Sequence, residues 1–301
     1  MIGEFDSVPA SDARDDHGEG PSWDARTGQL LWVDQYLGLV RRADFDPGTG
    51  RLIPIAGYQV GAPVGAVVPL VEPGTGWLVA YDHGFGLLDP DGQVRALAQP
   101  VPAGPPRRRM NDGKCGPDGS FWAGTMAFDK SPGAGSLYRL APDGQVSELL
   151  TGVTISNGLA WSADGRTLFY IDTPTQRIDR FELSAAGGLG PRRAVVTIPA
   201  QAGHPDGMTI DDEGCLWVAL WDGWAVRRYA PDGELLATVA VDAPQVSSCC
   251  FGGPDRSILF ITTSQEGMDA ATRARYPNSG RVFRAEVGVR GPLARPWRGP
   301  A

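Results

Sequence analysis

Short apolar runs, separated by turn-forming residues, recur along the whole chain. Apolar runs of about five residues flank Asp-Gly pairs, which supply the positive φ angle that tight hairpin turns require. No stretch shows a convincing helical period over about 11 residues. The pairs are Asp91-Gly92, Asp118-Gly119, Asp143-Gly144, Asp164-Gly165 and Asp232-Gly233. The pattern therefore predicts antiparallel β-hairpins rather than helices.

The hairpins recur as six units, and an aromatic residue marks the second strand of each unit. These anchors are Trp32, Trp77, Trp122, Phe169, Trp217 and Phe260, spaced 45, 45, 47, 48 and 43 residues apart. In the fourth unit, residues 158–162, 167–172, 177–183 and 193–198 are predicted to be four successive strands. Four strands in about 45 residues is the size of one propeller blade. The sequence thus predicts an all-β fold: one six-bladed β-propeller domain over residues 1–301, with four antiparallel strands per blade around a central channel.

The two ends of the chain lie outside this repeat. Residues 1–16 precede the first unit, and an Arg- and Pro-rich segment, residues 288–301, follows the last one. A ring of blades has to be closed so that no strand edge stays unpaired. We expect one of the two segments to help close the ring, and the sequence leaves open which one does so.

Composition and charge exclude several classes of function. The chain has 27 Lys+Arg against 35 Asp+Glu, a net charge of −8, and its one basic run is Arg107–Arg109. Nucleic acid binding, which depends on neutralising phosphates, is therefore not expected. The first residues are acidic where a signal peptide is basic and apolar, and no apolar run is long enough to span a membrane. Four cysteines without a C-x-x-C pair fit reduced thiols. We expect a cytoplasmic monomer that acts on a small molecule.

Oxygen-bearing side chains occupy equivalent positions in four of the units. The innermost strand of a blade begins beside the channel, and counting back 11 to 13 residues from each anchor reaches that point. The count ends at residues 64–66 in unit two and 247–249 in unit six. In the other units it ends at Glu19, Asn111, Asn157 and Asp206. Asn and Asp also favour turns and strand ends, so each residue taken alone is open to a purely structural interpretation.

Convergence of these residues on the channel would bring two carboxylates together. At a separation of about 4 Å they would repel by about 4 kcal/mol at an effective dielectric constant near 20. A divalent cation between them would remove this repulsion. Two carboxylates and an amide oxygen suit Ca²⁺, Mg²⁺ or Mn²⁺, with Zn²⁺ or Fe²⁺ as alternatives. Three protein ligands leave room for water and substrate, which is typical of a catalytic cation.

Other catalytic templates do not match the sequence. It contains neither a G-x-S-x-G elbow nor a G-x-x-x-x-G-K-[ST] phosphate loop. Asp211-Asp212-Glu213-Gly214 lacks the twelve-residue spacing of an EF-hand and is predicted to be a hairpin turn. His17 and His204 each precede a candidate ligand by two residues. We interpret them either as groups that support the ligands or as residues of the channel rim.

Five collinear strings resemble the senescence-marker-protein/gluconolactonase family, the regucalcin-like proteins. They are GEGPSW (18–23), RMNDGKCGPDGSFWAGTM (109–126), SNGLAWSADG (156–165), PDGMTIDDEGCLWVA (205–219) and SSCCFGG (247–253). The resemblance covers residues 18 to 286, nearly the whole chain. It implies a six-bladed propeller with one divalent cation in its channel and the hydrolysis of sugar lactones to aldonic acids.

The resemblance also implies roles for single residues. The metal-binding residues of the family are similar to Glu19, Asn157 and Asp206, which the repeat register selects as well, and Asp206 is the implied base that activates water. These three residues stand within GEGP, SNGLAWS and PDGM.

A further set of residues is implied to contact the substrate. The Arg and Asn of the R-x-N-D-G-K string match Arg109 and Asn111. A carboxylate shortly after GTM is similar to Asp129, although the preceding Ala127-Phe128 departs from the more acidic pattern of some members.

Two other functions stay open at this point. The same architecture could carry a metal-dependent esterase or organophosphatase, because a fold does not fix a function. Alternatively, the protein could be a non-catalytic metal-binding regulator, which would need large exposed apolar or charged patches instead of an open cation site.

Overall fold

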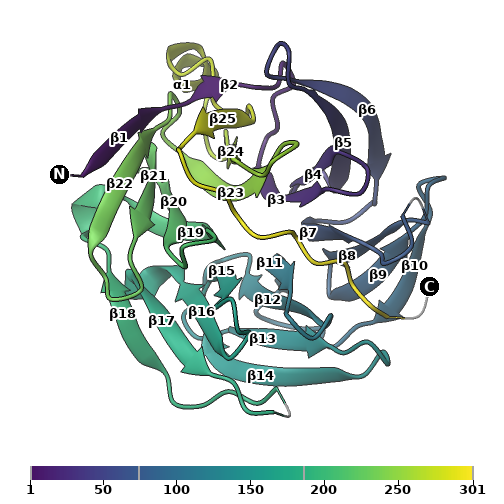
Figure 1. Ribbon diagram of the computed structural model, residues 1–301. Coiled ribbons are helices and arrows are strands. Elements are labelled where there is room, and N and C mark those ends of the chain that lie inside the picture. The colour runs from purple at the N-terminus through teal and green to yellow at the C-terminus, as the bar shows by residue number, and fades with distance from the viewer. Residues whose placement is uncertain (1, 74, 186, 300–301) are drawn as a thin grey trace.

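Six β-sheets surround a central channel, as Figure 1 shows. The computed structural model describes residues 2–73, 75–185 and 187–299. Apart from two N-terminal strands at outer edges, the order of strands within each sheet follows the chain, from the channel outward. The predicted six-bladed β-propeller is confirmed.

Each blade is built from a meander of antiparallel strands. Blades one to three contain β3 (Gly18–Asp24), β4 (Gln29–Asp34), β5 (Leu39–Asp46) and β6 (Arg51–Gln59); β7 (Val64–Pro69), β8 (Trp77–Tyr81), β9 (Gly84–Leu88) and β10 (Val94–Ala98); and β11 (Arg108–Cys115), β12 (Phe121–Ala127), β13 (Gly135–Leu140) and β14 (Val146–Val153). Blades four to six contain β15 (Ser156–Trp161), β16 (Thr167–Asp172), β17 (Arg177–Glu182) and β18 (Arg193–Thr197); β19 (His204–Ile210), β20 (Leu216–Trp221), β21 (Ala225–Tyr229) and β22 (Leu235–Ala240); and β23 (Val246–Gly252), β24 (Ile258–Thr263) and β25 (Phe283–Glu286). The four strands predicted in the fourth unit correspond to β15–β18.

The aromatic anchors fill the space between neighbouring blades. All six lie on the second strand of a blade and are buried. Trp122 packs edge to face on Trp161 of the next blade, with ring centroids 5.7 Å apart, and Trp217 does the same on Phe251 at 5.7 Å. Such aromatic pairs stabilise a core beyond the area they bury. The period of about 45 residues is therefore the period of the contacts between blades.

The Asp-Gly pairs form the predicted hairpin turns. Their glycines have φ angles between 70° and 100°, a region that side chains other than glycine rarely adopt. Each pair lies between two consecutive strands of one blade. The predicted hairpin connections are confirmed.

The N-terminal segment closes the ring. β2 (Val8–Pro9) pairs antiparallel with β25 and supplies the fourth strand of blade six. β1 (Gly3–Asp6) pairs in parallel with β22 and adds a fifth strand to blade five, where four strands were expected. The first residues of the chain thus join the last two blades, which answers the question that the sequence left open.

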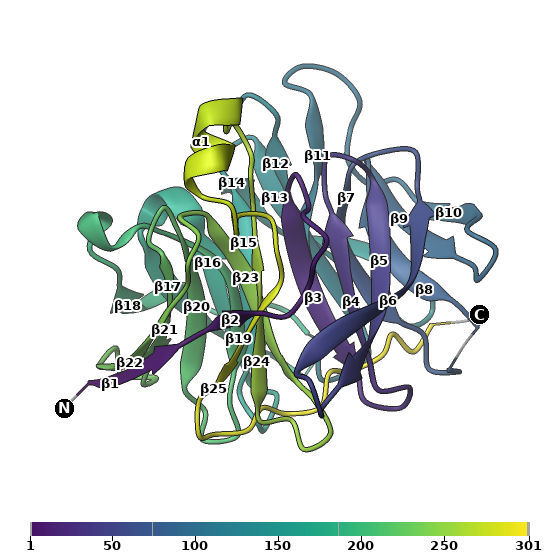
Figure 2. The ribbon, with the colours of Figure 1, turned by 90° about the horizontal axis from the view of Figure 1, so that it is seen from above.

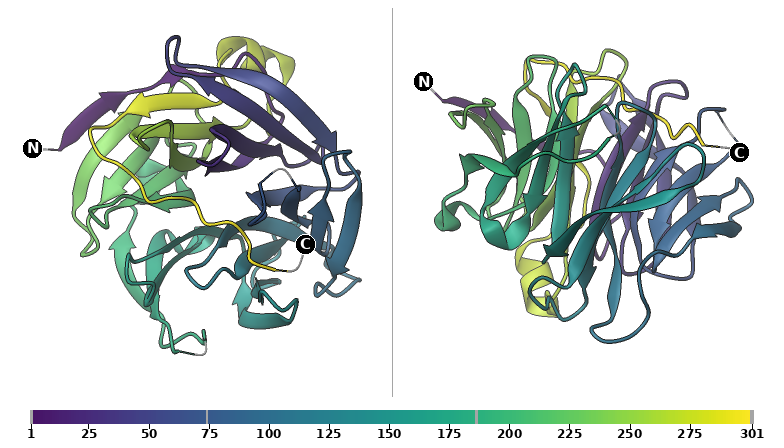
Figure 3. Two further views of the ribbon diagram at one scale, coloured as in Figure 1. Left: turned by 45° about the vertical axis from the view of Figure 1, so that its right-hand side comes forward. Right: turned by 90° about the horizontal axis from the view of Figure 1, so that it is seen from below.

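The C-terminal segment, residues 288–299, crosses one mouth of the channel, and we refer to it as the C-terminal strap. Figures 1 and 3 show it passing over the ring, and Figure 2 shows the short helix α1 (Ala270–Arg275) on the opposite face. The backbone N–H of Trp297 donates to the carbonyl oxygen of Pro69 at 3.0 Å, and that of Arg298 donates to Gly119 at 3.2 Å. The Trp297 side chain is 1% exposed and packs into the core. The strap therefore links the last blade to blades two and three.

Two features of the fold bear on earlier expectations. No helix within the three described ranges has the length and apolar character needed to cross a membrane. The four cysteines, Cys115, Cys215, Cys249 and Cys250, are buried and form no disulfide among the described residues.

Candidate functional site

The inner strand of every blade carries a β-bulge at the same level of the channel. The shifts in register against the second strand lie between Glu19 and Ser22, Val64 and Ala66, Met110 and Gly113, Asn157 and Leu159, Pro205 and Met208, and Val246 and Ser248. A bulge bends its strand and re-aims a side chain. The four oxygen-bearing residues that the register selected stand at these bulges, which explains why they converge.

Glycines beside the bulges allow the inner strands to approach one another. A Cβ atom on Gly65 would lie 1.8 Å from the carbonyl oxygen of Asn111 on the neighbouring blade. One on Gly158 would lie 2.8 Å from the carbonyl oxygen of Asp206. Any side chain at these positions would push the inner strands apart. The narrow channel therefore depends on residues without a side chain.

The bulged residues of blades one, three, four and five line a cavity of about 400 Å³ at the mouth opposite the C-terminal strap. Pockets of this size suit small-molecule ligands. Five of the six predicted site residues are part of the wall. The lining residues are His17, Glu19, Tyr36, Arg109, Asn111, Met126, Lys130, Ile155, Asn157, Thr173, Pro174, His204, Asp206, Trp221, Asp222 and Glu266.

Hydrogen bonds fix the orientation of the Asn157 amide. Its Nδ2 donates to Thr173 Oγ1 at 2.7 Å, and Thr173 Oγ1 donates in turn to the carbonyl oxygen of Pro205 at 2.8 Å. Its Oδ1 accepts from Asn111 Nδ2 at 2.7 Å and keeps a second lone pair. The oxygen of Asn157, rather than its nitrogen, is thus the atom presented beside the carboxylates.

Asn111 connects this amide to a buried arginine. Its Nδ2 also donates to the carbonyl oxygen of Ser156 at 2.8 Å, and its Oδ1 accepts from Arg109 Nη1 at 2.6 Å. Arg109 is 2% exposed, and its Nη2 donates to the Tyr36 hydroxyl at 3.2 Å. The guanidinium group lies 5.0 Å from the centre of the Tyr36 ring. Every polar atom of Asn111 is therefore engaged, which leaves it as a support for its neighbours.

Asp129 lies outside the cavity wall. Its exposed carboxylate accepts hydrogen bonds from the backbone N–H of Ser131 at 3.0 Å and from the Ser131 hydroxyl at 2.7 Å. The next residue, Lys130, lines the cavity instead. This arrangement does not support the predicted contact between Asp129 and a substrate.

The two histidines differ in their surroundings. His17 is 6% exposed, and its Nδ1 lies 2.8 Å from Ser264 Oγ. Burial, followed by the charge of Arg109, lowers the pKa of His17 to about 3, so its ring is neutral. His204 is exposed, with its Nδ1 2.6 Å from Gln176 Nε2. His17 thus belongs to the interior of the site and His204 to its rim.

A family model described as SMP-30/Gluconolactonase/LRE-like region matches residues 17–265. The chain belongs to this family. The match begins at His17 and ends one residue before Glu266, so it includes every inner strand whose bulge lines the cavity.

Relatives in the SMP-30/gluconolactonase family match the chain over nearly its full length. A regucalcin of Xenopus laevis is 38% identical over 283 residues, 91% of this chain and 92% of the relative. The solved structure of a calcium-binding protein, regucalcin, from Agrobacterium tumefaciens superposes with a TM-score of 0.89 at 29% identity, covering 99% of this chain and all of that one. A luciferin-regenerating enzyme superposes with a TM-score of 0.86 at 30% identity, covering 96% and 99%.

The oxygen donors that line the cavity fit a divalent cation. Burial, followed by the charge of Asp112, raises the pKa of Glu19 to about 8. Burial, followed by Glu19 itself, raises the pKa of Asp206 well above its ordinary value. Both shifts arise mainly from burial, to which a neighbouring carboxylate adds in each case, and the ion pairs among the described residues involve other acids. A positive charge between Glu19 and Asp206 would reverse both effects.

The amide is essential to such a donor set. The described residues contain no group of three or more His, Cys, Asp or Glu side chains placed to hold a metal ion. A cation would therefore use the Asn157 oxygen in addition to Glu19 and Asp206. Hard oxygen donors of this kind suit Ca²⁺, Mg²⁺ or Mn²⁺.

Sequence reasoning missed several residues of the cavity wall. They lie at or just after the end of the second strand in their blades: Trp221 is the last residue of β20, and Tyr36, Thr173 and Glu266 follow β4, β16 and β24. Because the second strand is antiparallel to the first, it ends at the mouth where the inner strand begins. Counting forward four to six residues from each anchor would have found them.

Proposed function

We propose that the chain hydrolyses a sugar lactone to the aldonic acid and that Glu19, Asn157 and Asp206 hold a divalent cation for this reaction. Family membership supports a function of the lactonase type. The observation that carries the proposal is the convergence of two buried carboxylates and one oriented amide oxygen from three blades on one cavity. Ca²⁺, Mg²⁺ and Mn²⁺ are the first cations to test, followed by Zn²⁺ and Fe²⁺.

When bound, the cation would polarise the lactone carbonyl and stabilise the charge that develops on its oxygen. Asp206 is the base that we assign. Its carboxylate lines the cavity, whereas the Nδ1 atoms of His17 and His204 are engaged with Ser264 and Gln176. Asp206 takes a proton from water as the water oxygen bonds to the carbonyl carbon. The ring C–O bond then breaks, and its oxygen takes up a proton to give the hydroxy acid.

Arg109 is proposed to hydrogen-bond the hydroxyls of the substrate. The Asn111 oxygen and the Tyr36 hydroxyl hold its guanidinium group at the cavity wall. A group that is held in place before the substrate arrives loses little entropy on binding, so it contributes orientation rather than chemistry. Asn111 would act mainly by supporting Arg109 and Asn157.

The test replaces two of the proposed ligands. We expect Asp206→Ala and Glu19→Gln each to lower kcat/KM for cation-dependent hydrolysis of five- and six-carbon aldonolactones by at least about 100-fold, because proton transfer and charge stabilisation are both lost. A pH-stat assay measures the acid released after the chain has been stripped with a chelator and reloaded with each cation.

Asp6→Ala, on the exposed edge strand of the same blade as Asp206, is the matched control and should retain full activity. Circular dichroism checks that all variants fold. Full cation-dependent activity in folded Asp206→Ala would refute the assignment. Phenyl acetate and a phosphotriester belong in the same assay, because preference for either would favour an esterase or an organophosphatase instead.

A further inference from the structure

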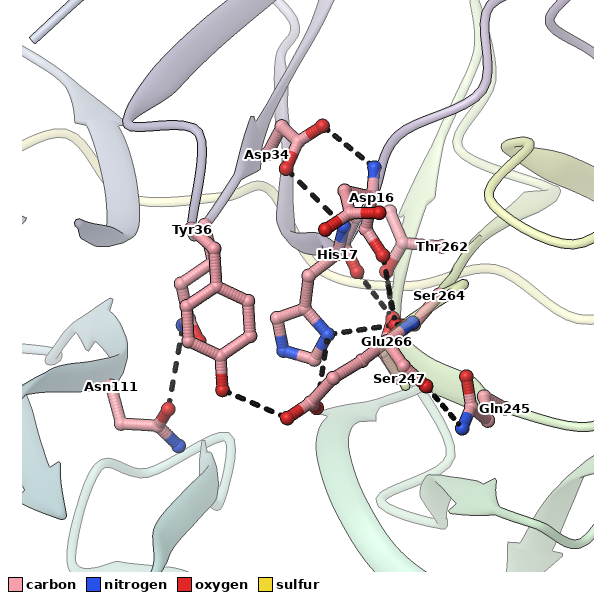
Figure 4. Close-up of polar contacts among 12 residues, drawn as sticks. Asp16, His17, Asp34, Tyr36, Asn111, Gln245, Ser247, Thr262, Ser264 and Glu266 are labelled. Carbon is pink, nitrogen blue, oxygen red and sulfur yellow. Dashed lines mark hydrogen bonds and ion pairs between the residues drawn. The ribbon is translucent and has the colours of Figure 1, made fainter. Parts of the chain in front are cut away.

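A second polar cluster lines the cavity, apart from the proposed cation ligands. Tyr36 stands in the turn between β4 and β5, and Glu266 follows β24, so the two residues come from neighbouring blades one and six. The Tyr36 hydroxyl donates to Glu266 Oε1 at 3.1 Å, as Figure 4 shows. The same hydroxyl accepts from Arg109 Nη2. A continuous chain of hydrogen bonds therefore runs from Arg109 through Tyr36 to Glu266.

The second oxygen of the Glu266 carboxylate is left available. Oε2 lies 3.7 Å from Nδ1 of the neutral His17 ring, which is longer than a hydrogen bond. The hydrogen bonds of the described residues supply no donor to Oε2. The side chain is 29% exposed and faces the cavity. An acceptor thus points into the space where a ligand would lie.

The backbone around Glu266 is fixed by its neighbours. Its N–H donates to Ser264 Oγ at 2.9 Å, and its carbonyl oxygen accepts from Gln245 Nε2 at 3.0 Å. With Tyr36 holding Oε1, both the main chain and the side chain have defined positions. A preformed acceptor of this kind binds a donor without the entropy cost of ordering a loop.

We propose that Glu266, oriented by Tyr36, accepts a hydrogen bond from a hydroxyl of the bound lactone and makes the site select hydroxylated lactones over unsubstituted ones. The inference rests on the proposed function and names a specificity residue for it. A carboxylate acceptor forms stronger hydrogen bonds with hydroxyls than a neutral acceptor does. A lactone without hydroxyls would bury Oε2 without a donor, which costs binding free energy. Asp129, the carboxylate that the sequence suggested for such a contact, faces solvent.

The experiment compares two substrates with the same ring. For Glu266→Ala, we expect kcat/KM toward a hydroxylated six-membered aldonolactone to fall about 10- to 100-fold, as for loss of a charge-assisted hydrogen bond. We expect kcat/KM toward unsubstituted δ-valerolactone to change less than about 3-fold, because no hydroxyl is present to lose its partner. The ratio of the two values is the measured quantity. The affinity of the cation-loaded protein for a non-hydrolysable sugar lactam, measured by calorimetry, is a second readout that does not depend on turnover.

Two further variants sharpen the test. Tyr36→Phe leaves the carboxylate in place but removes its orienting donor, and it also removes the acceptor of Arg109 Nη2. Because both Glu266 and Arg109 are proposed to contact substrate hydroxyls, this variant should shift the ratio in the same direction. Glu286→Gln, an exposed glutamate on β25 of the same blade, is the matched control and should leave the ratio unchanged.

The outcomes separate this inference from the function on which it rests. An unchanged ratio and unchanged lactam binding in Glu266→Ala would overturn the inference while leaving the lactonase intact. An equal loss on both lactones would also overturn it, since Glu266 would then act at the reacting centre. If the native chain hydrolyses no lactone with any cation, the proposed function itself fails. Should Glu266→Ala not fold, the ratio measured for the nearly isosteric Glu266→Gln decides the question.

Discussion

Asn157 and Asn111 show how single side chains are held in the cavity wall. An amide can present either its oxygen or its nitrogen, and only the oxygen can bind a cation. Thr173 accepts from the nitrogen of Asn157, so the oxygen points away from Thr173 and toward the Asn111 amide. Asn111 then bridges that oxygen to Arg109. Such supporting hydrogen bonds set the geometry of a ligand set nearly as much as the ligands themselves.

At the same scale, the raised pKa of Glu19 predicts how the cation-free protein responds to pH. Because its pKa is about 8 in the folded chain and near 4.5 in the unfolded one, the folded state binds the extra proton between these values. The free energy of unfolding should therefore fall as the pH rises from about 5 to 8. Bound cation should remove most of this fall, since it holds the carboxylate ionised.

Urea unfolding at several pH values, with chelator and with cation, measures the effect. The Glu19→Gln variant isolates it, because the remaining acids are unchanged. If, with chelator present, the free energy of unfolding depends equally steeply on pH in the native chain and in Glu19→Gln, groups other than Glu19 cause the dependence.

At the scale of elements, the repeated bulge positions the site. Aspartates at the ends of second strands bind the backbone that precedes the bulge of the inner strand. Asp34 accepts from the backbone N–H groups of Asp16 and His17, and Asp172 accepts from those of Thr154 and Ile155. These carboxylates satisfy backbone donors that would otherwise lack partners. The same structural solution thus recurs in blades one and four.

The close approach of the inner strands predicts a large effect for a single methyl group. Gly65→Ala would place its Cβ within 1.8 Å of the Asn111 carbonyl oxygen, so one of the two strands has to move. We expect the free energy of unfolding to fall by about 3 kcal/mol or more, as in strongly overpacked cores. We also expect weaker cation binding, since β11 carries Asn111 and thereby supports Asn157.

Chemical denaturation measures the free energy of unfolding, and titration calorimetry measures the affinity for the cation. Gly48→Ala is the control, because Gly48 lies in an exposed turn and has only the flexible Asp46 side chain nearby. It should change stability by less than about 0.5 kcal/mol. Similar stabilities for the two variants would show that the close contact between the inner strands at Gly65 is not important for stability.

The repeat made the blades and the inner-strand residues predictable. Trp122 and Trp217 mark second strands because their contacts recur once per blade. Glu19 and Asp206 could be found by counting because every inner strand bulges at the same level. Glu266 was missed because it lies beyond β24, six residues after its anchor Phe260, and thus after the end of a second strand rather than at the start of an inner strand. The solvent-facing position of Asp129 is a property of its own loop, set by Ser131.

At the scale of the whole molecule, the two ends of the chain attach to the ring in different ways. The N-terminal strands β1 and β2 join blades five and six by backbone pairing. The C-terminal strap instead reaches across the ring and inserts Trp297 into the core beside blades two and three. Its prolines lack the backbone N–H that a strand needs, which explains why it attaches by a side chain rather than by a long ladder.

Removal of this attachment should destabilise the ring without changing the site. We expect Trp297→Ala to lower the free energy of unfolding by about 3 to 5 kcal/mol, the usual cost of emptying a buried tryptophan position. Cation affinity, measured by calorimetry, should stay within about 2-fold, because the cavity opens at the other mouth. Trp224→Ala, at a tryptophan that is 38% exposed, is the control and should cost much less. Equal losses of stability would show that the strap contributes little.

The C-terminal strap also affects how small molecules enter and leave the cavity. Since the strap crosses one mouth of the ring and the cavity lies at the other, we expect small molecules to enter and leave the cavity on the same side. If the chain catalyses the proposed reaction, the acid product has to leave by that entrance before the next lactone can enter. Accumulating product would therefore compete directly with fresh lactone, and the rate of turnover would respond to how quickly the cell removes the acid.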